Sequence, residues 1–392
     1  MKKHAIIPIF IPHRGCPNDC VFCNQRKITA RTTAPTADEV KNTIDTWLTT
    51  LGEVPTVEIA FYGGSFTGLR LTEQSSYLAI AKEYKERGLI DKIHLSTRPD
   101  YIDRDILDNL KAYSVDTIEL GVQSFDDEVL LKSNRGHTST SVYEAVSLIK
   151  EYGFEFGIQL MIGLPGDSLE TCIYSAKETV KLKPSLTRLY PTIVIDDTEL
   201  LEMYERGEYK PLSREEAVTR TAAMYKILDE AGITIMRVGL KSTDIIGEGG
   251  SINGGTYHPA FRQLVEGRIA RDEIEPQLDR IVDEIRERRD KSCELIANHL
   301  QCRDLVNESF NQQRLSRVKV DVFSSPKWFS NAVGNSGENK KYFEEKYPEL
   351  SIKFRVDDSL EAAQFRINCN IKQCLGLQGI AFIMRLGLIA PC

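Results

Sequence analysis

The stretch that decides the fold is residues 6–23, IIPIFIPHRGCPNDCVFC, an apolar run followed by a cysteine-rich loop. The run at 6–11 is almost continuously apolar, as is typical of a strand buried on both faces of a parallel sheet. The loop after it carries Cys16, Cys20 and Cys23. Thiolates are soft ligands, and three from one loop can hold three irons of a 4Fe–4S cube. We therefore predict an iron–sulfur cluster on these three cysteines, with the fourth iron open to a cofactor or substrate.

Outward from this stretch, apolar runs rich in Ile, Val, Phe and Tyr alternate with amphipathic segments over the first 240 residues. Thr36 and Glu39 have the spacing of a helix capping box. We predict helices after residue 36 and at 103–112, 141–152 and 169–182, and strands at 6–11, 57–62, 92–96, 117–122, 156–162 and 188–194. Strands that alternate with helices imply a parallel sheet with right-handed crossovers. Six such units predict an α/β fold, a partial (β/α)6 TIM-like barrel.

The pattern changes after residue 240. A Gly-rich loop at 247–255 precedes a charged helix predicted at 277–300, and an α+β segment follows. We predict three parts: a barrel at 1–240, an extension at 241–310 and a smaller α+β domain at 311–392.

Bulk composition limits the function classes. The 392 residues carry a formal net charge of −7, which argues against a uniformly basic nucleic-acid binder but allows a local basic patch. No signal peptide or membrane span is expected from the short, Pro-interrupted N-terminal apolar run. Nine cysteines without an export signal indicate a reducing compartment, so we expect a cytoplasmic protein that does not enter a membrane.

The cysteine loop has two competing interpretations. Structural zinc prefers four ligands, and His13 could supply the fourth. Zinc ribbons, however, usually present two separated Cys-x2-Cys pairs, and the chain has no second pair. Buried thiols that fall at this spacing by chance are the other alternative.

The Cys-x3-Cys-x2-Cys loop after a first barrel strand resembles the radical S-adenosylmethionine superfamily. The resemblance covers residues 6 to about 260 and implies a 4Fe–4S cluster and S-adenosylmethionine as cofactors. It places Phe22 beside the adenine, the Gly63-Gly64-Ser65 motif on the methionine amino group, and Gly163 in the adenine-contacting segment. Gln123 and Gln159 match polar positions near ribose and substrate, and we add Ser96 to the predicted cofactor site. Read without the resemblance, Gly63-Gly64 is only a turn and the glutamines are only polar residues of the rim.

Within this superfamily, Gly121-Val122-Gln123-Ser124 and Arg135-Gly136-His137-Thr138 resemble the branch of the elongator catalytic subunit and the oxygen-independent coproporphyrinogen oxidases. The segments 96–100 and 257–261 favour the elongator-like side. Two departures limit what carries over. The elongator subunit spaces its first two cysteines differently and carries an acetyltransferase domain, which we do not find here. Ser96 also stands where that pattern has an acidic residue.

The resemblance implies that the enzyme reductively cleaves S-adenosylmethionine at the cluster and generates a 5′-deoxyadenosyl radical that abstracts hydrogen from the substrate. The protein then orients the cofactor and excludes water and oxygen. An electron donor such as a flavodoxin or ferredoxin is an expected partner.

A second signal lies at Gly334-Asn335-Ser336-Gly337, between two helical stretches and before a strand. It is similar to the Gly-x-x-Gly loop of KH domains, which clamps a nucleic-acid backbone. Residues 314–356 have nine positive and five negative side chains, a local charge of +4. Together with the resemblance to the elongator-like branch, these features lead us to predict RNA, in particular tRNA, as the substrate, held at Gly334, Gly337, Lys340 and Lys341.

Two other functions remain open. A small-molecule enzyme of the coproporphyrinogen-oxidase type needs convergent cations for substrate carboxylates, and Arg98, Arg135 and Arg188 are the candidates. A non-catalytic RNA-binding protein with a structural metal is the third reading.

Overall fold

The computed structural model describes residues 4–11, 16, 20–24, 33–240, 252–300 and 317–369, without the side chains of residues 289 and 292–300. The chain forms two compact units, residues 1–262 and 263–392. The predicted boundaries at residues 240 and 310 stay predictions. Among the described residues, no helix combines the length and the apolar character that crossing a membrane requires.

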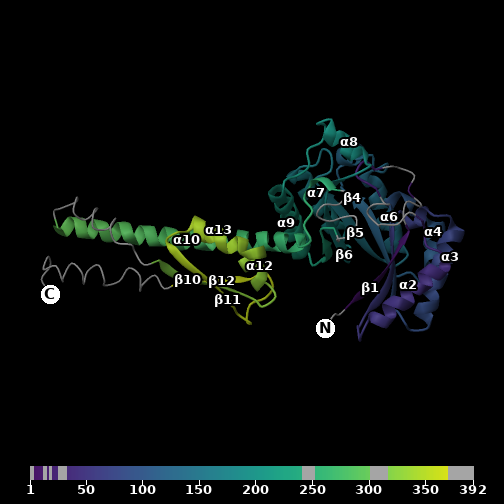
Figure 1. Ribbon diagram of the computed structural model, residues 1–392, viewed down its shortest axis with the longest axis horizontal. Helices are drawn as coiled ribbons and strands as arrows, with labels where there is room; N and C mark the ends of the chain where they lie inside the picture. Colours follow the sequence, from purple (N-terminus) through teal and green to yellow (C-terminus); the bar gives the residue numbers. More distant parts are fainter. Residues whose placement is uncertain are drawn as a thin grey trace. The chain divides into compact units, whose positions relative to one another are not determined.

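The N-terminal unit is built on a seven-stranded parallel sheet that curls into a partial barrel, with helices on its outer face (Figure 1). The predicted α/β partial-barrel fold is confirmed. The strands, in spatial order, are β1 (Ala5–Ile11), β2 (Val57–Gly63), β3 (Lys92–Thr97), β4 (Thr117–Gln123), β5 (Glu155–Ile162), β6 (Leu186–Pro191) and β8 (Thr234–Val238). The helices are α2 (Ala37–Thr50), α3 (Leu71–Glu86), α4 (Arg104–Ala112), α5 (Asp127–Lys132), α6 (Ser139–Glu151), α7 (Leu169–Leu182), α8 (Glu199–Glu205) and α9 (Arg214–Glu230).

Local chemistry explains these elements. The Thr36 hydroxyl accepts the Glu39 N–H and the Glu39 carboxylate accepts the Thr36 N–H, so the predicted capping box begins α2. In the sheet, the register aligns Ile7, Ile59 and Ile93 on neighbouring strands, and all three are fully buried. This apolar ladder packs under the helices and leaves the opposite side of each strand facing the barrel interior.

Two strand predictions are wrong in detail. The run predicted at 188–194 is not one strand: β6 ends at Pro191, which has no N–H to extend the ladder, and β7 (Ile193–Ile195) pairs antiparallel with β9 (Ile252–Gly255). The six predicted strands also lack β8, a short strand that pairs with β6 at the edge of the sheet. Its irregular burial hides it from a periodicity argument.

The C-terminal unit contains the long helix α10 (Phe261–Leu300) and a three-stranded sheet in the order β11-β10-β12. Its other elements are β10 (Val318–Ser324), α12 (Phe329–Val333), α13 (Glu338–Lys346), β11 (Leu350–Val356) and β12 (Phe365–Cys369). The helix predicted at 277–300 in fact begins at Phe261 and continues through Pro276. Because proline is typical of a first helical turn, the prediction began the helix directly after Pro276 rather than at Phe261.

Candidate active site

The glycine pair after β2 ties the loop to the end of β1. Gly63 has a φ of +116°, and a Cβ atom there would lie 2.7 Å from the carbonyl oxygen of Ile11. The Gly64 N–H donates to the same oxygen at 2.9 Å. Only glycine permits this close approach, which brings the predicted cofactor loop beside the start of the cysteine loop.

The cysteines are accompanied by two buried arginines. Arg135 lies with Nη1 3.3 Å from Cys20 Sγ and donates from Nη2 to the Gly121 carbonyl at 2.5 Å. Arg98 is 2% exposed and forms two hydrogen bonds, of 2.9 and 2.8 Å, with the Asp100 carboxylate. Each guanidinium retains one buried nitrogen, Arg135 Nε and Arg98 Nη1, without a hydrogen-bond partner. Buried donors beside thiols indicate that negative charge is meant to bind here.

The surroundings of Cys16 have opposing effects on the pKa of its thiol. Burial raises the pKa of Cys16 most, and Cys20 adds to it, while Arg135, Arg98 and a Ser65 backbone hydrogen bond lower it. Burial and the charge of Arg135 lower the pKa of the neighbouring His137 to about 4, so this histidine is neutral at physiological pH.

The donor set fits an iron–sulfur cluster with S-adenosylmethionine: three thiolates and a carboxylate would be compensated by Arg98 and Arg135. In the described part of the chain, however, no three His, Cys, Asp or Glu side chains are gathered closely enough to hold a metal ion. The ligand role of Cys16, Cys20 and Cys23 therefore stays a prediction. His13, the alternative zinc ligand, lies outside the described residues.

The predicted serines differ in what their hydroxyls do. Ser65 is buried, and its Oγ bonds to Thr97 Oγ1 at 2.8 Å and accepts the Arg98 N–H at 3.0 Å. This hydroxyl therefore links the loops after β2 and β3. Ser96 Oγ is buried without a partner and lines a narrow cleft with Tyr62 and Gly64.

The two predicted glutamines lie together inside the barrel. Gln159 Nε2 donates to Gln123 Oε1 at 3.3 Å. Gln123 has a φ of +73°, a left-handed conformation that residues other than glycine rarely adopt. Such strain concentrates at functional sites, which supports the predicted role of Gln123.

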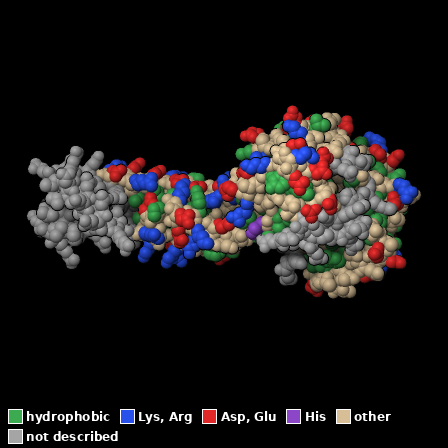
Figure 2. All heavy atoms as spheres, turned by 45° about the horizontal axis from the view of Figure 1, so that its top comes forward, with side chains coloured by type: hydrophobic (Ala, Val, Ile, Leu, Met, Phe, Trp, Pro, Cys, Tyr) green, Lys and Arg blue, Asp and Glu red, His purple; other side chains and the backbone are tan. Residues whose placement is uncertain are grey.

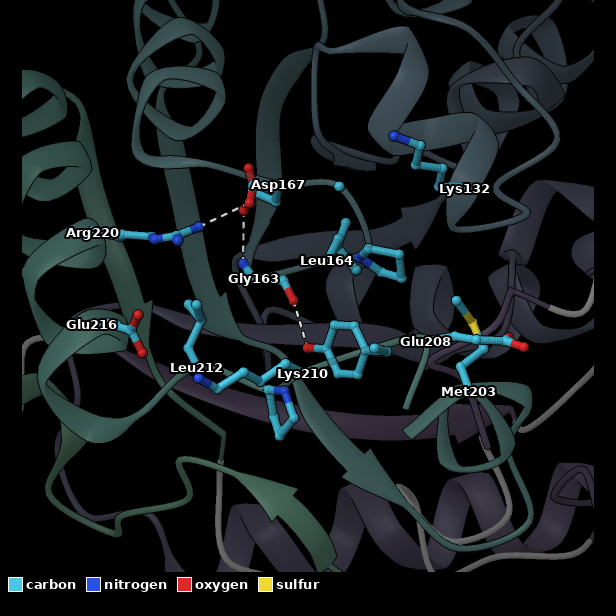
Figure 3. Close-up of a pocket in the computed structure, with 14 residues that line it drawn as sticks. Lys132, Gly163, Leu164, Asp167, Met203, Glu208, Lys210, Leu212, Glu216 and Arg220 are labelled. Atoms are coloured by element: carbon cyan, nitrogen blue, oxygen red, sulfur yellow. Dashed lines mark hydrogen bonds between the residues drawn. The ribbon is translucent and has the colours of Figure 1, made fainter. Parts of the chain in front are cut away.

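The loop after β5 is held from several sides. The Gly163 N–H donates to Asp167 Oδ2 at 2.7 Å, and Tyr209 Oη donates to the Gly163 carbonyl at 2.6 Å. Figure 3 shows Arg220 reaching towards Asp167, whose carbonyl oxygen it bonds at 3.0 Å. This loop borders a pocket of about 530 Å³, within the size range of small-molecule sites. Phe22 packs against a buried cluster of Val21, Val194, Leu200 and Tyr209, and of these Tyr209 lines the pocket.

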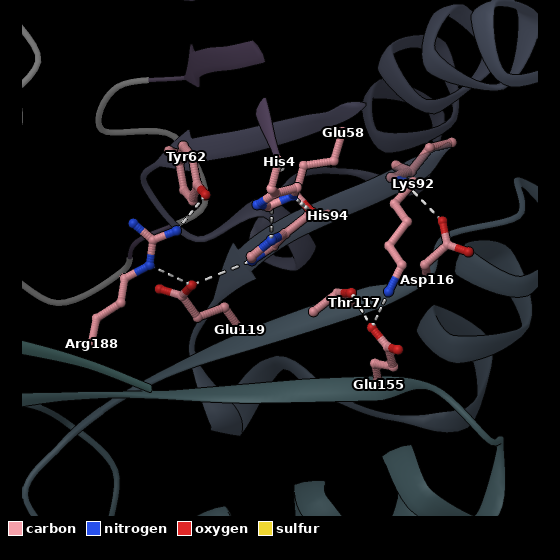
Figure 4. A network of polar contacts seen from close by, with 11 residues as sticks. His4, Glu58, Tyr62, Lys92, His94, Asp116, Thr117, Glu119, Glu155 and Arg188 are labelled. Atoms are coloured by element: carbon pink, nitrogen blue, oxygen red, sulfur yellow. Dashed lines mark hydrogen bonds and ion pairs between the residues drawn. The ribbon is translucent and has the colours of Figure 1, made fainter. Parts of the chain in front are cut away.

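A chain of buried charges crosses the barrel interior, and the sequence analysis missed it (Figure 4). His94 lies between two glutamates: Nδ1 is 3.3 Å from Glu58 and Nε2 is 3.3 Å from Glu119. Arg188 Nε donates to the same Glu119 oxygen at 2.8 Å, and Arg188 Nη2 donates to Tyr62 Oη at 2.6 Å. These residues come from β2, β3, β4 and β6. The available signal was a charged residue in the middle of each of several apolar strands.

Opposing effects set the charges in this chain. Burial lowers the pKa of His94, but the two carboxylates beside it, Glu119 and Glu58, outweigh this effect and raise the pKa to about 9. Burial raises the pKa of Glu119, and the charges of Arg188 and His94 overcome it, so the net pKa is lowered. At neutral pH, two positive groups therefore face two negative ones.

The predicted RNA-binding residues lie in the C-terminal unit, at the turn between α12 and α13. Gly334 is buried and its Cβ would lie 2.6 Å from the Asn339 nitrogen, whereas a Cβ on Gly337 would meet nothing within 4 Å. Lys340 and Lys341 are exposed on α13. Figure 2 shows Lys and Arg mixed with Asp and Glu over this unit rather than a continuous basic surface. Gly334 thus has a structural reason to be glycine, and Gly337 has room for a ligand.

Comparison with known proteins identifies the family. Residues 10–178 match the Radical SAM superfamily and residues 184–271 match the Radical_SAM C-terminal domain. The chain belongs to the radical S-adenosylmethionine superfamily. The cofactors of that superfamily are a 4Fe–4S cluster and S-adenosylmethionine, so both cofactor predictions are confirmed at the level of the family. The partial barrel is also the fold of archaeal Elp3 from Methanocaldococcus infernus, with a TM-score of 0.55 and 22% identity over 68% of this chain and 62% of that one.

Curated relatives of this radical S-adenosylmethionine protein carry tRNA-related names. A tRNA uridine(34) acetyltransferase of Methanocaldococcus jannaschii is 38% identical over 127 residues, 32% of this chain and 24% of that protein. Human Elongator complex protein 3 is 34% identical over 162 residues, 40% of this chain and 29% of its own. A tRNA uridine(34) acetyltransferase of Dehalococcoides mccartyi is 26% identical over 230 residues, half of each chain. The matches span about a quarter to a half of these relatives' length.

Proposed function

We propose that this protein is a radical S-adenosylmethionine enzyme that modifies a tRNA base in the cytoplasm. The observation that carries the proposal is the set of relatives named for tRNA uridine(34) modification, combined with a partial barrel whose rim presents the three cysteines. Because the matches reach at most half of those relatives' length, acetyl transfer is not part of the proposal.

The chain's own residues have separate tasks in this scheme. Cys16, Cys20 and Cys23 would hold the cluster, and its bound S-adenosylmethionine would supply a carbon-centred radical after one electron arrives from a flavodoxin or ferredoxin. Arg98 and Arg135 would balance the negative charge of thiolates and carboxylate through their buried free nitrogens. Gln123 and Gln159, which lie together inside the barrel, would position the ribose of the cofactor and the substrate.

The loop after β5 would bind S-adenosylmethionine through its main-chain groups. Gly163 and the glycine pair Gly63-Gly64 let main-chain groups approach the cofactor closely. Phe22, packed on the cluster around Tyr209, would offer an apolar face to the adenine. These assignments are specific enough to test one residue at a time.

The C-terminal unit would hold the RNA. Gly337 precedes α13, a helix of nine residues whose first-turn N–H groups are suited to a backbone phosphate. Exposed Lys340 and Lys341 follow on the same helix, although Lys340 also pairs with Glu344 at 3.9 Å. The similarity to a KH loop and these cations support tRNA as the substrate.

The coproporphyrinogen-type alternative has weaker support because its three candidate cations are engaged. Arg98 pairs with Asp100, and Arg188 pairs with Glu119. Arg135 donates to a main-chain carbonyl and to Cys20. The nitrogens left without a partner, Arg98 Nη1 and Arg135 Nε, are assigned above to the cluster and its cofactor, so a substrate carboxylate would have to compete for them.

The decisive experiment compares anaerobically reconstituted wild type with Cys20→Ala and a matched control, Cys172→Ala. Cys172 on α7 is also buried, but its sulfur contacts Asp167, in the loop after β5, rather than the rim arginines. We expect Cys20→Ala to lose most of its iron and its release of 5′-deoxyadenosine under reduction, while Cys172→Ala keeps both. Zinc instead of iron, or iron without cleavage of the cofactor, would favour the non-catalytic metal protein.

The RNA step is tested at Gly337, where a side chain meets no neighbour. Gly337 has a φ of +77°, a conformation that Asp and Asn tolerate better than other residues. Gly337→Asp adds a negative charge at the proposed phosphate site, and Gly337→Asn is its uncharged match. We expect tRNA affinity to fall about tenfold or more for Asp and little for Asn, with mass spectrometry of nucleosides reporting the modification. Equal affinities would remove this unit from substrate binding.

A further inference from the structure

Tyr62 occupies a special place in the barrel. It directly precedes the glycine pair at the end of β2, and its ring faces the interior between two charged groups. The Arg188 guanidinium carbon lies 5.0 Å from the ring centroid, and the His94 ring meets it edge-on at 5.7 Å. Arg188 comes from β6, four strands away in the sheet order. The contact therefore spans the interior of the barrel beneath the predicted cofactor loop.

The hydrogen bonds of the Tyr62 hydroxyl are incomplete. Its oxygen accepts from Arg188 Nη2 at 2.6 Å, and a guanidinium has no acceptor to take a proton in return. Among the described residues, no acceptor is recorded for the Tyr62 O–H. Burial raises the pKa of Tyr62 well above its ordinary value, so the phenol stays protonated at physiological pH. The hydroxyl is thus a fixed donor with nothing to donate to.

The groups below Tyr62 restrict what this donor can meet. Arg188 is paired with Glu119, and His94 lies between Glu119 and Glu58. The positive charges of Arg188 and His94 therefore balance the negative charges of the two glutamates. An anionic ligand would find no spare cation among them, because taking Arg188 would strand the buried Glu119. A neutral ring with an acceptor oxygen matches the site better.

The cleft next to Tyr62 links this donor to the predicted cofactor site. Tyr62, Gly64 and Ser96 line the same narrow cleft, and Ser96 Oγ is also buried without a partner. Chemistry in barrels of this kind takes place at the carboxyl ends of the strands, where Tyr62 lies. A substrate that reaches the carboxyl ends of β2 and β3 from within the barrel would come close to this hydroxyl.

We propose that the Tyr62 hydroxyl donates a hydrogen bond to a carbonyl oxygen of the reacting base of the RNA, a neutral nucleobase, and that Arg188 positions this hydroxyl. Tyr62 is then a substrate-contacting residue, and Arg188 is a positioning residue that Glu119 and His94 hold in place. The proposal rests on the function proposed above and specifies the recognition of its substrate.

The test is Tyr62→Phe in the reconstituted holoenzyme, because phenylalanine keeps the ring against His94 and Arg188 and removes only the hydroxyl. The matched control is Tyr77→Phe, whose hydroxyl bonds the Pro35 carbonyl away from this chain of charges. The substrate is unmodified, in-vitro-transcribed tRNA. Modified nucleoside is measured by mass spectrometry, and 5′-deoxyadenosine is measured with and without RNA.

We expect Tyr62→Phe to keep its iron content and to unfold at a somewhat lower temperature, because Arg188 Nη2 loses its buried acceptor. Its kcat/KM for modified nucleoside should fall about tenfold, the effect of one lost neutral hydrogen bond. More 5′-deoxyadenosine should be released per product because the radical and the base are poorly aligned. Tyr77→Phe should match wild type in every measurement.

Arg188→Lys separates positioning from contact. Lysine retains a charge for Glu119 but cannot bond Glu119 and Tyr62 with the geometry of a guanidinium. We expect Arg188→Lys to lower kcat/KM for modified nucleoside about as much as Tyr62→Phe does. Adding Tyr62→Phe to Arg188→Lys should cause no further loss, because both variants remove the same interaction. Additive effects would overturn the positioning role.

The outcomes distinguish failure of the Tyr62 inference from failure of the proposed function. If wild type produces modified nucleoside and Tyr62→Phe does so with the same kcat/KM and the same 5′-deoxyadenosine per product, this inference is overturned and the proposed function stands. Wild type that cleaves S-adenosylmethionine but modifies no base of the tRNA would overturn the proposed function and this inference with it.

Discussion

The charge on His94 makes a quantitative prediction about stability. The imidazole is buried between Glu58 and Glu119, and its pKa is raised from 6.5 to about 9 in the folded chain. The difference of about 2.5 pKa units corresponds to about 3.5 kcal/mol of folding free energy when fully expressed, at about 1.4 kcal/mol per unit. Because folding favours the protonated form, this stabilisation is complete below the unfolded pKa and is lost as the pH rises through about 9.

Replacing the residue isolates this contribution. His94→Gln keeps hydrogen-bonding capacity but cannot carry a charge at any pH. At about pH 6 we expect the variant to be less stable than wild type by about 3 kcal/mol. Towards pH 10 the gap should shrink to the residual packing cost, since the wild-type histidine is then neutral as well. The pKa values of Glu58 and Glu119 are both lowered, so these carboxylates titrate below this window.

The two tryptophans permit a clean assay. Trp47 lies on α2 in the N-terminal unit and Trp328 lies in the C-terminal unit, so Trp328→Phe leaves fluorescence that reports on the barrel alone. In this background, urea unfolding of the full-length, metal-free protein would be measured at several pH values, once with His94 and once with His94→Gln. Without metal, no pH-dependent ligand binding contributes. A gap that stays constant from about pH 6 to about pH 10, or that grows with pH, would refute the assigned charge.

Three further variants probe other contacts. Arg188→Leu leaves the buried Glu119 without its main cation and should cost about 3–5 kcal/mol in urea unfolding of the N-terminal unit, most of it recovered when Glu119→Leu is added. Asn339→Ala removes hydrogen bonds from Asn339 Nδ2 to the carbonyls of Gly267 at 2.7 Å and Asn331 at 3.1 Å. It should destabilise the C-terminal unit by about 1–3 kcal/mol, measured by Trp328 fluorescence in a Trp47→Phe background. Gly163→Ala places a Cβ 2.7 Å from Leu212 at a φ of +85°, so binding of S-adenosylmethionine in equilibrium dialysis should weaken several-fold; unchanged binding would dissociate this loop from the cofactor.

Local pattern was enough to predict the barrel. The apolar runs, the capping box at Thr36 and the regular alternation of strand and helix all act over a few residues, so the sequence displays them directly. The cysteine spacing belongs to the same class, since three ligands of one cluster lie in one short loop. For this reason the fold class and the iron–sulfur cluster were predicted from the residues themselves, whereas the family and S-adenosylmethionine were implied by the resemblance of the cysteine loop to a known superfamily.

Features that depend on distant pairing were not predicted. Arg188 and Tyr62 are 126 positions apart, and Arg188 and Glu119 are 69 apart. In strands buried on both faces, periodicity does not tell which side faces the barrel interior, so the charged residues there had no visible partners. The edge strand β8 and the break after Pro191 likewise depend on what lies next to them in the sheet.

The glycines of the α12–α13 turn illustrate the same division. As sequence, Gly334 and Gly337 are equivalent members of one motif. In the fold, a side chain at Gly334 would collide with Asn339, whereas one at Gly337 has open space. The sequence by itself determined which residue types are present and how they are spaced along the chain. Only the tertiary structure decided which of them are enclosed, because burial and charge pairing arise between segments that the chain brings together when it folds.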